Sequence, residues 1–263
     1  MKNIKLKLSI LIKKVDIRLL FKFLKRYSKI RPYHKNALSQ LKKLNFKHIR
    51  KHSFSTWKYY GKNLVRFTYK GTLDSKTYLI KCSKGFEEKA QNSILFQETF
   101  NDVFDFIPKG FTLPLEGFYG QAFSFIKSYP FYYFKYFVTK ENSGNFTEQI
   151  CKILDNLNSF KIVHCDINSV NVLIERKSNK LFLIDFDTCI SHKVGLLCHD
   201  VPRSKYATLT QNTAIYDDAK AFFELLDEIN KHLSVFSKED LESLRSRIGR
   251  NVVRLDKKYC NYK

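Results

Sequence analysis

The sequence predicts an α+β protein in which a β-rich N-terminal part precedes a mainly helical C-terminal part. Residues 53–127 contain β-branched and aromatic runs around turn residues, whereas from residue 128 onward most of the pattern is helical and amphipathic. Apolar residues make up 44% of the chain, with 24 Phe and 15 Tyr, so a sizeable core is available. We therefore expect three segments: a basic segment at 1–52, a small β-rich lobe at 53–127 and a helical lobe at 128–263.

The N-terminal segment carries most of the net charge of +22. Residues 1–52 hold 17 of the 47 Lys and Arg residues but only one of the 25 acids. Apolar residues recur here at helical spacing, at Leu8, Ile12, Val15, Leu19 and Phe23. A basic helix with an apolar face favours contact with an anionic membrane, and the alternative is a helix packed on its own domain. Nucleic acid is disfavoured because no recognised binding motif accompanies the charge.

The β-rich part begins with a predicted hairpin. The runs 63–71 and 76–82 are rich in β-forming residues and flank the turn-like sequence GTLDS. A helical stretch is expected at 86–101 and a further strand at 120–128.

Three amphipathic helices are expected in the C-terminal part, at 145–160, 216–229 and 237–249. Asn145 followed by Glu148 resembles a capping box for the first of these helices. Ser237 and Gly249 are typical of the start and the end of the third.

Polar residues lie at the open end of a second predicted hairpin, one at the start of its first strand and one directly after its second. The β runs Val170–Glu175 and Lys180–Ile184 are separated by RKSN. Asn171 lies at the start of the first run and Asp185 follows the second, so antiparallel pairing brings them together. Asp166 precedes the hairpin by a few residues. Two carboxylates and an amide oxygen are therefore expected at one edge of a small sheet.

This set of side chains is suited to a magnesium–nucleotide complex. Mg²⁺ prefers hard oxygen ligands, usually one or two carboxylates together with phosphate oxygens. A further Asp near the γ-phosphate can orient an attacking hydroxyl and accept its proton. Since phosphoryl transfer depends mainly on positioning and charge neutralisation, few residues suffice.

At these residues the sequence resembles the two-lobed protein-kinase-like fold. His164, Asp166 and Asn171 match the H-x-D-x-x-x-x-N catalytic loop of that fold, and DFD at 185–187 takes the place of its DFG motif. The resemblance implies ATP and Mg²⁺ as cofactors and Asp166 as the catalytic base or the residue that orients the attacking hydroxyl. It implies Asn171 and Asp185 as magnesium ligands and His164 as the residue that braces the loop.

Three weaker matches extend the resemblance. Lys81 in YLIKC resembles the lysine that binds the α- and β-phosphates, and Glu98 in the next helical stretch is expected to pair with it, with Glu88 as the alternative. Asp217 or Asp218 resembles the acid that tethers the catalytic loop from below.

Departures from the protein-kinase pattern point to a different acceptor. HCD replaces HRD, Asn168 stands where Ser/Thr kinases usually have lysine, and no APE triplet follows. Only YYGKN is a candidate for the glycine-rich loop. DINSVNVLI and LIDFD resemble the bacterial lipopolysaccharide core kinases, which phosphorylate Kdo or heptose, although Thr188 replaces a basic residue common there.

That resemblance implies an ATP-dependent kinase for a sugar hydroxyl of lipopolysaccharide core or a related lipid-linked glycan. Its expected location is cytoplasmic and peripheral on the inner face of the cell membrane, bound through residues 1–30. Acceptor contacts are expected after Asp187, through residues 201–210. The six cysteines form no CxxC pair and no signal peptide is recognised, which favours the cytosol.

Two other functions remain open at this point. A soluble small-molecule kinase of the aminoglycoside or choline type would share the fold without needing the basic segment. A kinase-fold binding module without catalysis is the second alternative. Such modules typically lose the metal-binding Asp or the Lys, whereas Lys81, Asp166, Asn171 and Asp185 are all present.

Overall fold

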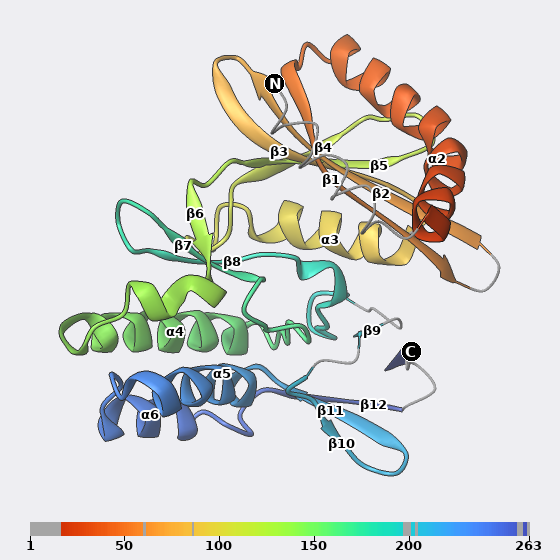
Figure 1. Ribbon diagram of the computed structural model, residues 1–263. Coiled ribbons are helices and arrows are strands. Elements are labelled where there is room, and N and C mark those ends of the chain that lie inside the picture. Colours follow the sequence, from red (N-terminus) through yellow and green to blue (C-terminus); the bar gives the residue numbers. More distant parts are fainter. Residues whose placement is uncertain are drawn as a thin grey trace.

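The computed structural model describes residues 17–59, 62–85, 87–196, 201–202, 205–256 and 260–261, and it shows an α+β protein. The sheet-rich N-terminal half and the helical C-terminal half lie one above the other in Figure 1. The elements of the first half are α2 (Ile17–Lys43), β1 (Lys47–Tyr59), β2 (Lys62–Leu73), β3 (Lys76–Lys84), α3 (Glu87–Phe100), β4 (Gly110–Leu113) and β5 (Tyr119–Ser124).

The second half begins with a short strand and a 3-10 helix. Its elements are β6 (Ser128–Pro130), the 3-10 helix η1 (Phe131–Tyr136), α4 (Lys140–Ser159), β7 (Val172–Glu175), β8 (Leu181–Leu183), the 3-10 helix η2 (Phe186–Thr188), β9 (Val201–Pro202), β10 (Thr208–Leu209), β11 (Thr213–Asp217), α5 (Asp218–Leu233), α6 (Lys238–Arg245), β12 (Val252–Asp256) and β13 (Cys260–Asn261).

The first half is built on a five-stranded antiparallel sheet with the order β1-β2-β3-β5-β4. The predicted hairpin at its centre is confirmed, since β2 and β3 pair from Val65 and Lys84 to Leu73 and Lys76. The turn residues Asp74 and Ser75 both have positive φ, 47° and 63°. This left-handed geometry matches the twist of the flanking strands and explains the tight connection.

One face of the sheet is covered by α2, and α3 lies on the opposite side (Figure 1). Ile30, Ala37 and Leu41 of α2 are buried in one cluster with Phe67 and Ile80 of the sheet. Burial of apolar surface therefore attaches the C-terminal half of this helix to the sheet.

The expected boundary between a basic segment at 1–52 and a lobe beginning at 53 is wrong. It cuts through β1 (Lys47–Tyr59), and the α2 residues from Ile30 onward belong to the core of the sheet. Sequence reasoning missed this because β1 is rich in Lys and His and shows little apolar alternation. Residues 1–16 lie outside the described residues, so membrane contact through residues 1–30 stays a prediction. None of the helices in the described part of the chain combines the length and the apolar character that a membrane crossing requires.

The other face of the sheet carries polar residues toward α3. Alternation along β2 buries Val65 and Phe67 on the α2 side, so Arg66 between them points the other way. On β5, Gln121 is buried and its Oε1 accepts a hydrogen bond of 2.9 Å from Ser93 of α3. This face of the sheet borders the candidate site.

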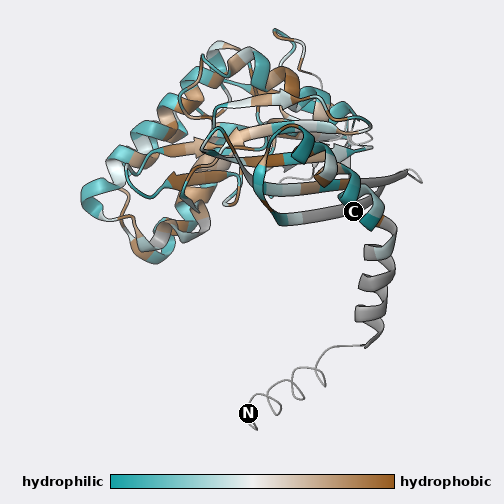
Figure 2. Ribbon diagram, turned by 90° about the horizontal axis from the view of Figure 1, so that it is seen from above, coloured by the Kyte–Doolittle hydropathy of each residue, from teal (hydrophilic) through white to brown (hydrophobic). Residues whose placement is uncertain are grey.

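The main core lies in the C-terminal half and extends into α3. Phe96 and Phe100 of α3, Phe146 of α4, Phe222 of α5 and Leu183 of β8 share one buried cluster. In Figure 2 the hydrophobic residues are concentrated on the strands in the middle of the molecule and on parts of the helices around them. Because α3 contributes to this cluster and also contacts the sheet, it connects the two halves.

Two of the expected helix starts can be compared with the structure. Ser237 caps α6 as predicted, accepting a hydrogen bond of 3.0 Å from Asp240 N. Asn145 is not the cap of α4, because that helix begins at Lys140 with Thr139 and Asn142 forming the capping box. Ser143, Phe146 and Thr147 of α4 are already buried. The helix therefore begins before Ile150, the position from which the apolar residues recur regularly.

The packing of α2 is tested by Leu41→Ala. Leu41 is fully buried, so its truncation should lower the free energy of unfolding by about 2–5 kcal/mol. Urea unfolding followed by circular dichroism measures this change. Lys42→Ala is the matched control because Lys42 is exposed on the same turn. Equal stability of the two variants would show that α2 is not part of the folded core.

Candidate active site

The β7–β8 hairpin brings Asn171 and Asp185 to the same edge of a small sheet, as the sequence predicts. Val172 pairs with Leu183, and Ile184 N donates a hydrogen bond of 2.9 Å to Asn171 O. Asp185 follows directly and has a left-handed backbone, with φ 69° and ψ 54°. A non-glycine residue in this conformation is costly and is often found at functional sites.

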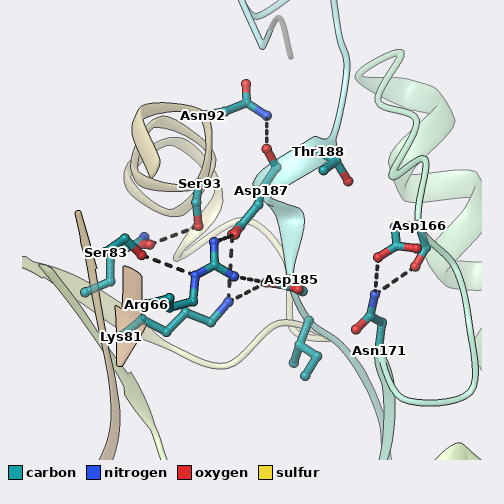
Figure 3. A network of polar contacts seen from close by, with 12 residues as sticks. Arg66, Lys81, Ser83, Asn92, Ser93, Asp166, Asn171, Asp185, Asp187 and Thr188 are labelled. Carbon is teal, nitrogen blue, oxygen red and sulfur yellow. Dashed lines mark hydrogen bonds and ion pairs between the residues drawn. The ribbon is translucent and has the colours of Figure 1, made fainter. Parts of the chain in front are cut away.

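The carboxylate of Asp166 is held by two amide side chains. Asn171 Nδ2 donates to Asp166 Oδ2 at 2.9 Å and to its backbone oxygen at 2.8 Å (Figure 3). Asn168 Nδ2 donates to Asp166 Oδ1 at 3.1 Å. Burial, and then the negative charge of Asp185, raise the pKa of Asp166 to about 6, while the two amide hydrogen bonds oppose that rise. The group therefore has a pKa closer to neutrality than an ordinary Asp, which suits a proton acceptor.

His164 connects the Asp166 loop to the strand end before Asp185. It is fully buried, and burial lowers its pKa to about 4, so the ring is neutral at pH 7. Its Nε2 lies 2.9 Å from Ile184 O, which can only accept, so the single ring proton is on Nε2. Its Nδ1 then accepts from Asp166 N at 3.3 Å. These two bonds agree with the bracing role that the resemblance implies.

Asp218 binds the backbone of the loop that carries Asp166. Its carboxylate accepts hydrogen bonds from His164 N at 2.7 Å and from Cys165 N at 3.3 Å. Cys165 has a φ of 66°, so these bonds stabilise a left-handed residue. The neighbouring Asp217 has a different role, because it caps α5 through Lys220 N at 3.1 Å. Of the two acids left open by the sequence, Asp218 contacts the loop.

Four charged side chains form a network between the sheet and the residues 185–187 (Figure 3). Lys81 Nζ lies 2.5 Å from Asp185 Oδ1 and 3.8 Å from Asp187 Oδ1. Arg66 Nη1 lies 3.8 Å from Asp185 Oδ1, and Arg66 Nη2 donates to Asp187 Oδ2. Burial by itself would raise the pKa of Asp185, but Lys81 and Arg66 outweigh it and keep that pKa well below its usual range.

The expected pairing of Lys81 with Glu98 is wrong. The ion pairs of Lys81 run to Asp185 and Asp187, so Glu88 is not its partner either. Glu98 is exposed and accepts a hydrogen bond of 2.9 Å from Thr112 Oγ1. The spacing of 17 residues could not reveal which face of α3 points to the cleft.

Four residues of this site were not singled out by the sequence as site residues: Arg66, Asn92, Asn168 and Asp187. Asn92 of α3 donates to the backbone oxygens of Asp187 at 3.2 Å and Cys189 at 2.8 Å, which ties the helix to the segment after β8. The alternation of β2 could have predicted the orientation of Arg66, because it places this residue on the polar face of the strand. No local sequence pattern could have predicted that Arg66 pairs with Asp187, because the two residues are 121 positions apart.

A cavity of about 350 Å³ lies beside Lys81 and Asp185, between the two halves of the molecule. Leu79 and Phe123 of the sheet and Leu173 of β7 are among its apolar walls. Its size and apolar lining are typical of small-molecule sites.

The side-chain oxygens at the cleft fit a magnesium ion whose remaining ligands are phosphate oxygens. Both hydrogen bonds donated by the Asn171 amide go to Asp166, and its Oδ1 faces away from that carboxylate (Figure 3). Asp185 adds a carboxylate at the same sheet edge. Within the described residues no group of three His, Cys, Asp or Glu side chains could hold a metal alone. A carboxylate, an amide oxygen and phosphate oxygens match the preference of Mg²⁺.

A scan against protein-family models and a search of the curated proteins gave no match to this chain.

Asp218 should make stability depend on pH. Burial raises its pKa from 3.8 to about 7, so the folded state binds this proton more tightly than the unfolded chain. The resulting stability is present below pH 3.8 and is lost as the pH rises through about 7. The unfolding free energy of the wild type relative to Asp218→Asn should therefore fall over this range, by at most about 1.4 kcal/mol per pH unit.

Urea unfolding at several pH values measures this difference. Asp155→Asn is the control of opposite sign, since the hydrogen bond from Arg247 lowers the pKa of Asp155. The contribution of Asp155 is lost as the pH falls through its lowered pKa, not as it rises. A difference between wild type and Asp218→Asn that does not change with pH would contradict the prediction.

Proposed function

We propose that this protein is an ATP-dependent phosphotransferase with a two-lobed protein-kinase-like fold. The convergence of Lys81, Asp166, Asn171 and Asp185 around one cleft carries the proposal. These residues come from β3, the Asp166 loop and the β7–β8 hairpin. The adjoining cavity of about 350 Å³ offers apolar walls for a nucleobase.

Each residue has a role that follows from its contacts. Asp166 accepts the proton of the acceptor hydroxyl, because its carboxylate is ionised once the pH exceeds its pKa of about 6. Asn171 and Asp185 would hold Mg²⁺, and the ion would supply neutralisation of the charge on the transferred phosphate. Lys81, which pairs with Asp185 at 2.5 Å, would bind the phosphates of the nucleotide in place of that carboxylate. His164 maintains the spacing between Asp166 and Asp185.

The acceptor that we propose is a sugar hydroxyl of lipopolysaccharide core or a related lipid-linked glycan. This part of the proposal rests on the resemblance of DINSVNVLI and LIDFD. A second cavity, of about 570 Å³, supports an acceptor site beside the Asp166 loop, because Asn168 and Ser169 line it together with Lys205 and Tyr206. The last two lie in the segment 201–210, where the sequence predicts acceptor contacts. A small-molecule acceptor would use the same cavity.

The roles of the two carboxylates are separated by Asp166→Ala and Asp185→Ala. Loss of the base should reduce turnover by about 10²- to 10⁴-fold or more while nucleotide binding stays close to wild type. Loss of Asp185 should remove the extra thermal stabilisation that Mg²⁺ adds to that of ATP. Phosphate release or transfer and melting curves with ATP, with and without Mg²⁺, measure the two effects.

The matched control is Asp102→Ala, an Asp whose side chain is 90% exposed and which pairs with Lys109. It should behave as the wild type in both assays. Near-native turnover in Asp166→Ala, or an undiminished Mg²⁺ effect in Asp185→Ala, would refute the site assignment.

The binding module without catalysis has one observation in its favour. Lys81 pairs with the carboxylate that would hold the metal and not with an acid of α3. The same melting curves address it, because magnesium-dependent stabilisation by ATP requires Asp185 to exchange partners. Stabilisation without any phosphotransfer would favour the module.

We further propose that the N-terminal segment binds the inner face of the cell membrane. Deletion of residues 1–16 tests this without disturbing the α2 residues Ile30, Ala37 and Leu41 that pack on the sheet. The shortened chain should lose cosedimentation with anionic vesicles, and with it the contribution of about 1 kcal/mol per basic residue near the surface. Cosedimentation that the deletion leaves unchanged would assign membrane contact to another part of the chain, and a full-length chain that does not cosediment would refute membrane contact.

A further inference from the structure

Most of the positive charge of the protein lies in the folded first half. Residues 17–84, which span α2 and the strands β1, β2 and β3, contain 19 Lys or Arg residues and a single acid, Asp74. Residues 1–16 contain only five basic residues and one acid, and residues 85–263 contain 23 basic and 23 acidic residues. Such a local excess produces a positive potential over one part of the surface.

The two sides of the five-stranded sheet differ in how their cations are balanced. On the side toward α3, Arg66 and Lys81 are largely buried and pair with Asp185 and Asp187. On the side that α2 covers, the cations described below are exposed to solvent. The only acid of this part of the sequence, Asp74, lies in the β2–β3 turn. The charge on the α2 side therefore has no comparable set of acids beside it.

Three exposed cations form a stripe along α2. Arg31, Lys35 and Lys42 are four and seven residues apart, so they lie on the same side of a helix with 3.6 residues per turn. The α2 residues that pack on the sheet lie on another side of the helix. Glu116 contacts α2 through hydrogen bonds between its backbone and Gln40, which also lies away from this stripe.

Two exposed lysines of the sheet extend this stripe. Lys51 of β1 is in register with Tyr69, whose hydroxyl lies 2.8 Å from Nδ1 of His34 in α2. Burial, and then the charge of Lys51, lower the pKa of His34, which agrees with a position of Lys51 close to the helix. Lys84 of β3 has its Nζ 4.6 Å from the centre of the Tyr33 ring of α2. We call these five cations the basic face: Arg31, Lys35, Lys42, Lys51 and Lys84.

We propose that the basic face binds the headgroups of a membrane rich in anionic lipid, together with residues 1–16. This inference rests on the membrane contact proposed above. Each basic residue near such a surface strengthens binding roughly fivefold, and stable attachment takes two signals, here a charged surface and an apolar segment. The apolar spacing of Leu8, Ile12 and Val15, directly before α2, favours a bilayer over nucleic acid, the other polyanion that suits this charge.

The orientation of the basic face is compatible with the proposed site. The cleft at Lys81 and Asp185 lies beyond the opposite side of the sheet from α2 (Figure 1). Contact of α2 with a membrane therefore leaves the cleft open to nucleotide and to a sugar that extends away from its lipid.

Cosedimentation of the full-length chain with vesicles tests the basic face. The combined substitutions Arg31→Gln, Lys35→Gln and Lys42→Gln should weaken binding to mixed phosphatidylcholine and phosphatidylglycerol vesicles about 100-fold, because three charges near the surface are lost. The combination Arg31→Lys, Lys35→Arg and Lys42→Arg keeps the charges and should bind as the wild type. Since all three side chains are exposed, both variants should keep the melting temperature of the wild type.

The matched control removes three exposed lysines of the C-terminal half, by Lys140→Gln, Lys177→Gln and Lys238→Gln. It has the same net charge as the three-Gln variant of α2 and should bind as the wild type. An equal loss of binding in the two variants would show that only the net charge matters, and it would overturn the basic face.

The membrane contact proposed above and this inference fail in different ways. A full-length wild type that does not bind anionic vesicles would refute both and leave the phosphotransferase assignment untouched. Binding that is lost on deletion of residues 1–16 but unchanged in the three-Gln variant of α2 would overturn the basic face alone. An oligonucleotide that displaces the wild type from vesicles at physiological salt would overturn the choice of a membrane as the partner.

Discussion

The candidate site depends on the hydrogen bonds of one buried imidazole. His164 links the backbone of Asp166 to the backbone of Ile184, directly before Asp185. Only the neutral tautomer with its proton on Nε2 satisfies both partners, and burial keeps the ring neutral by lowering its pKa to about 4. The spacing of the two carboxylates is thus set by a neutral imidazole. Because this ring carries no positive charge, it does not compete with other cations for either carboxylate.

A second constraint is the balance of charge around Asp185. Lys81 and Arg66 approach this carboxylate from the sheet, while Asp187 holds Arg66 from the other side. Buried ion pairs seldom add stability equal to their desolvation cost, so a network of four charges at a cleft is better explained by function than by folding.

The parts of the site that were predicted correctly are local in the chain. The β7–β8 hairpin brings Asn171 to Asp185 through a connection of a few residues, and the amide contacts of Asp166 lie within the same loop. The errors concern contacts over longer distances or weak patterns. The Glu98 pairing required knowledge of which side of α3 faces the cleft, and β1 was missed because its many charged residues hide its pairing with β2.

The sequence by itself determined the α+β class, the two hairpins and the short-range geometry around Asp166 and Asp185. Turn residues, alternation and hydrogen bonds across a few residues specify these features without reference to distant parts of the chain. Only the tertiary structure decided that α2 packs on the sheet, that Asp218 contacts the loop and that Arg66 pairs with Asp187. That ion pair joins residues 121 positions apart, and it depends on how the sheet, α3 and the β7–β8 hairpin pack together.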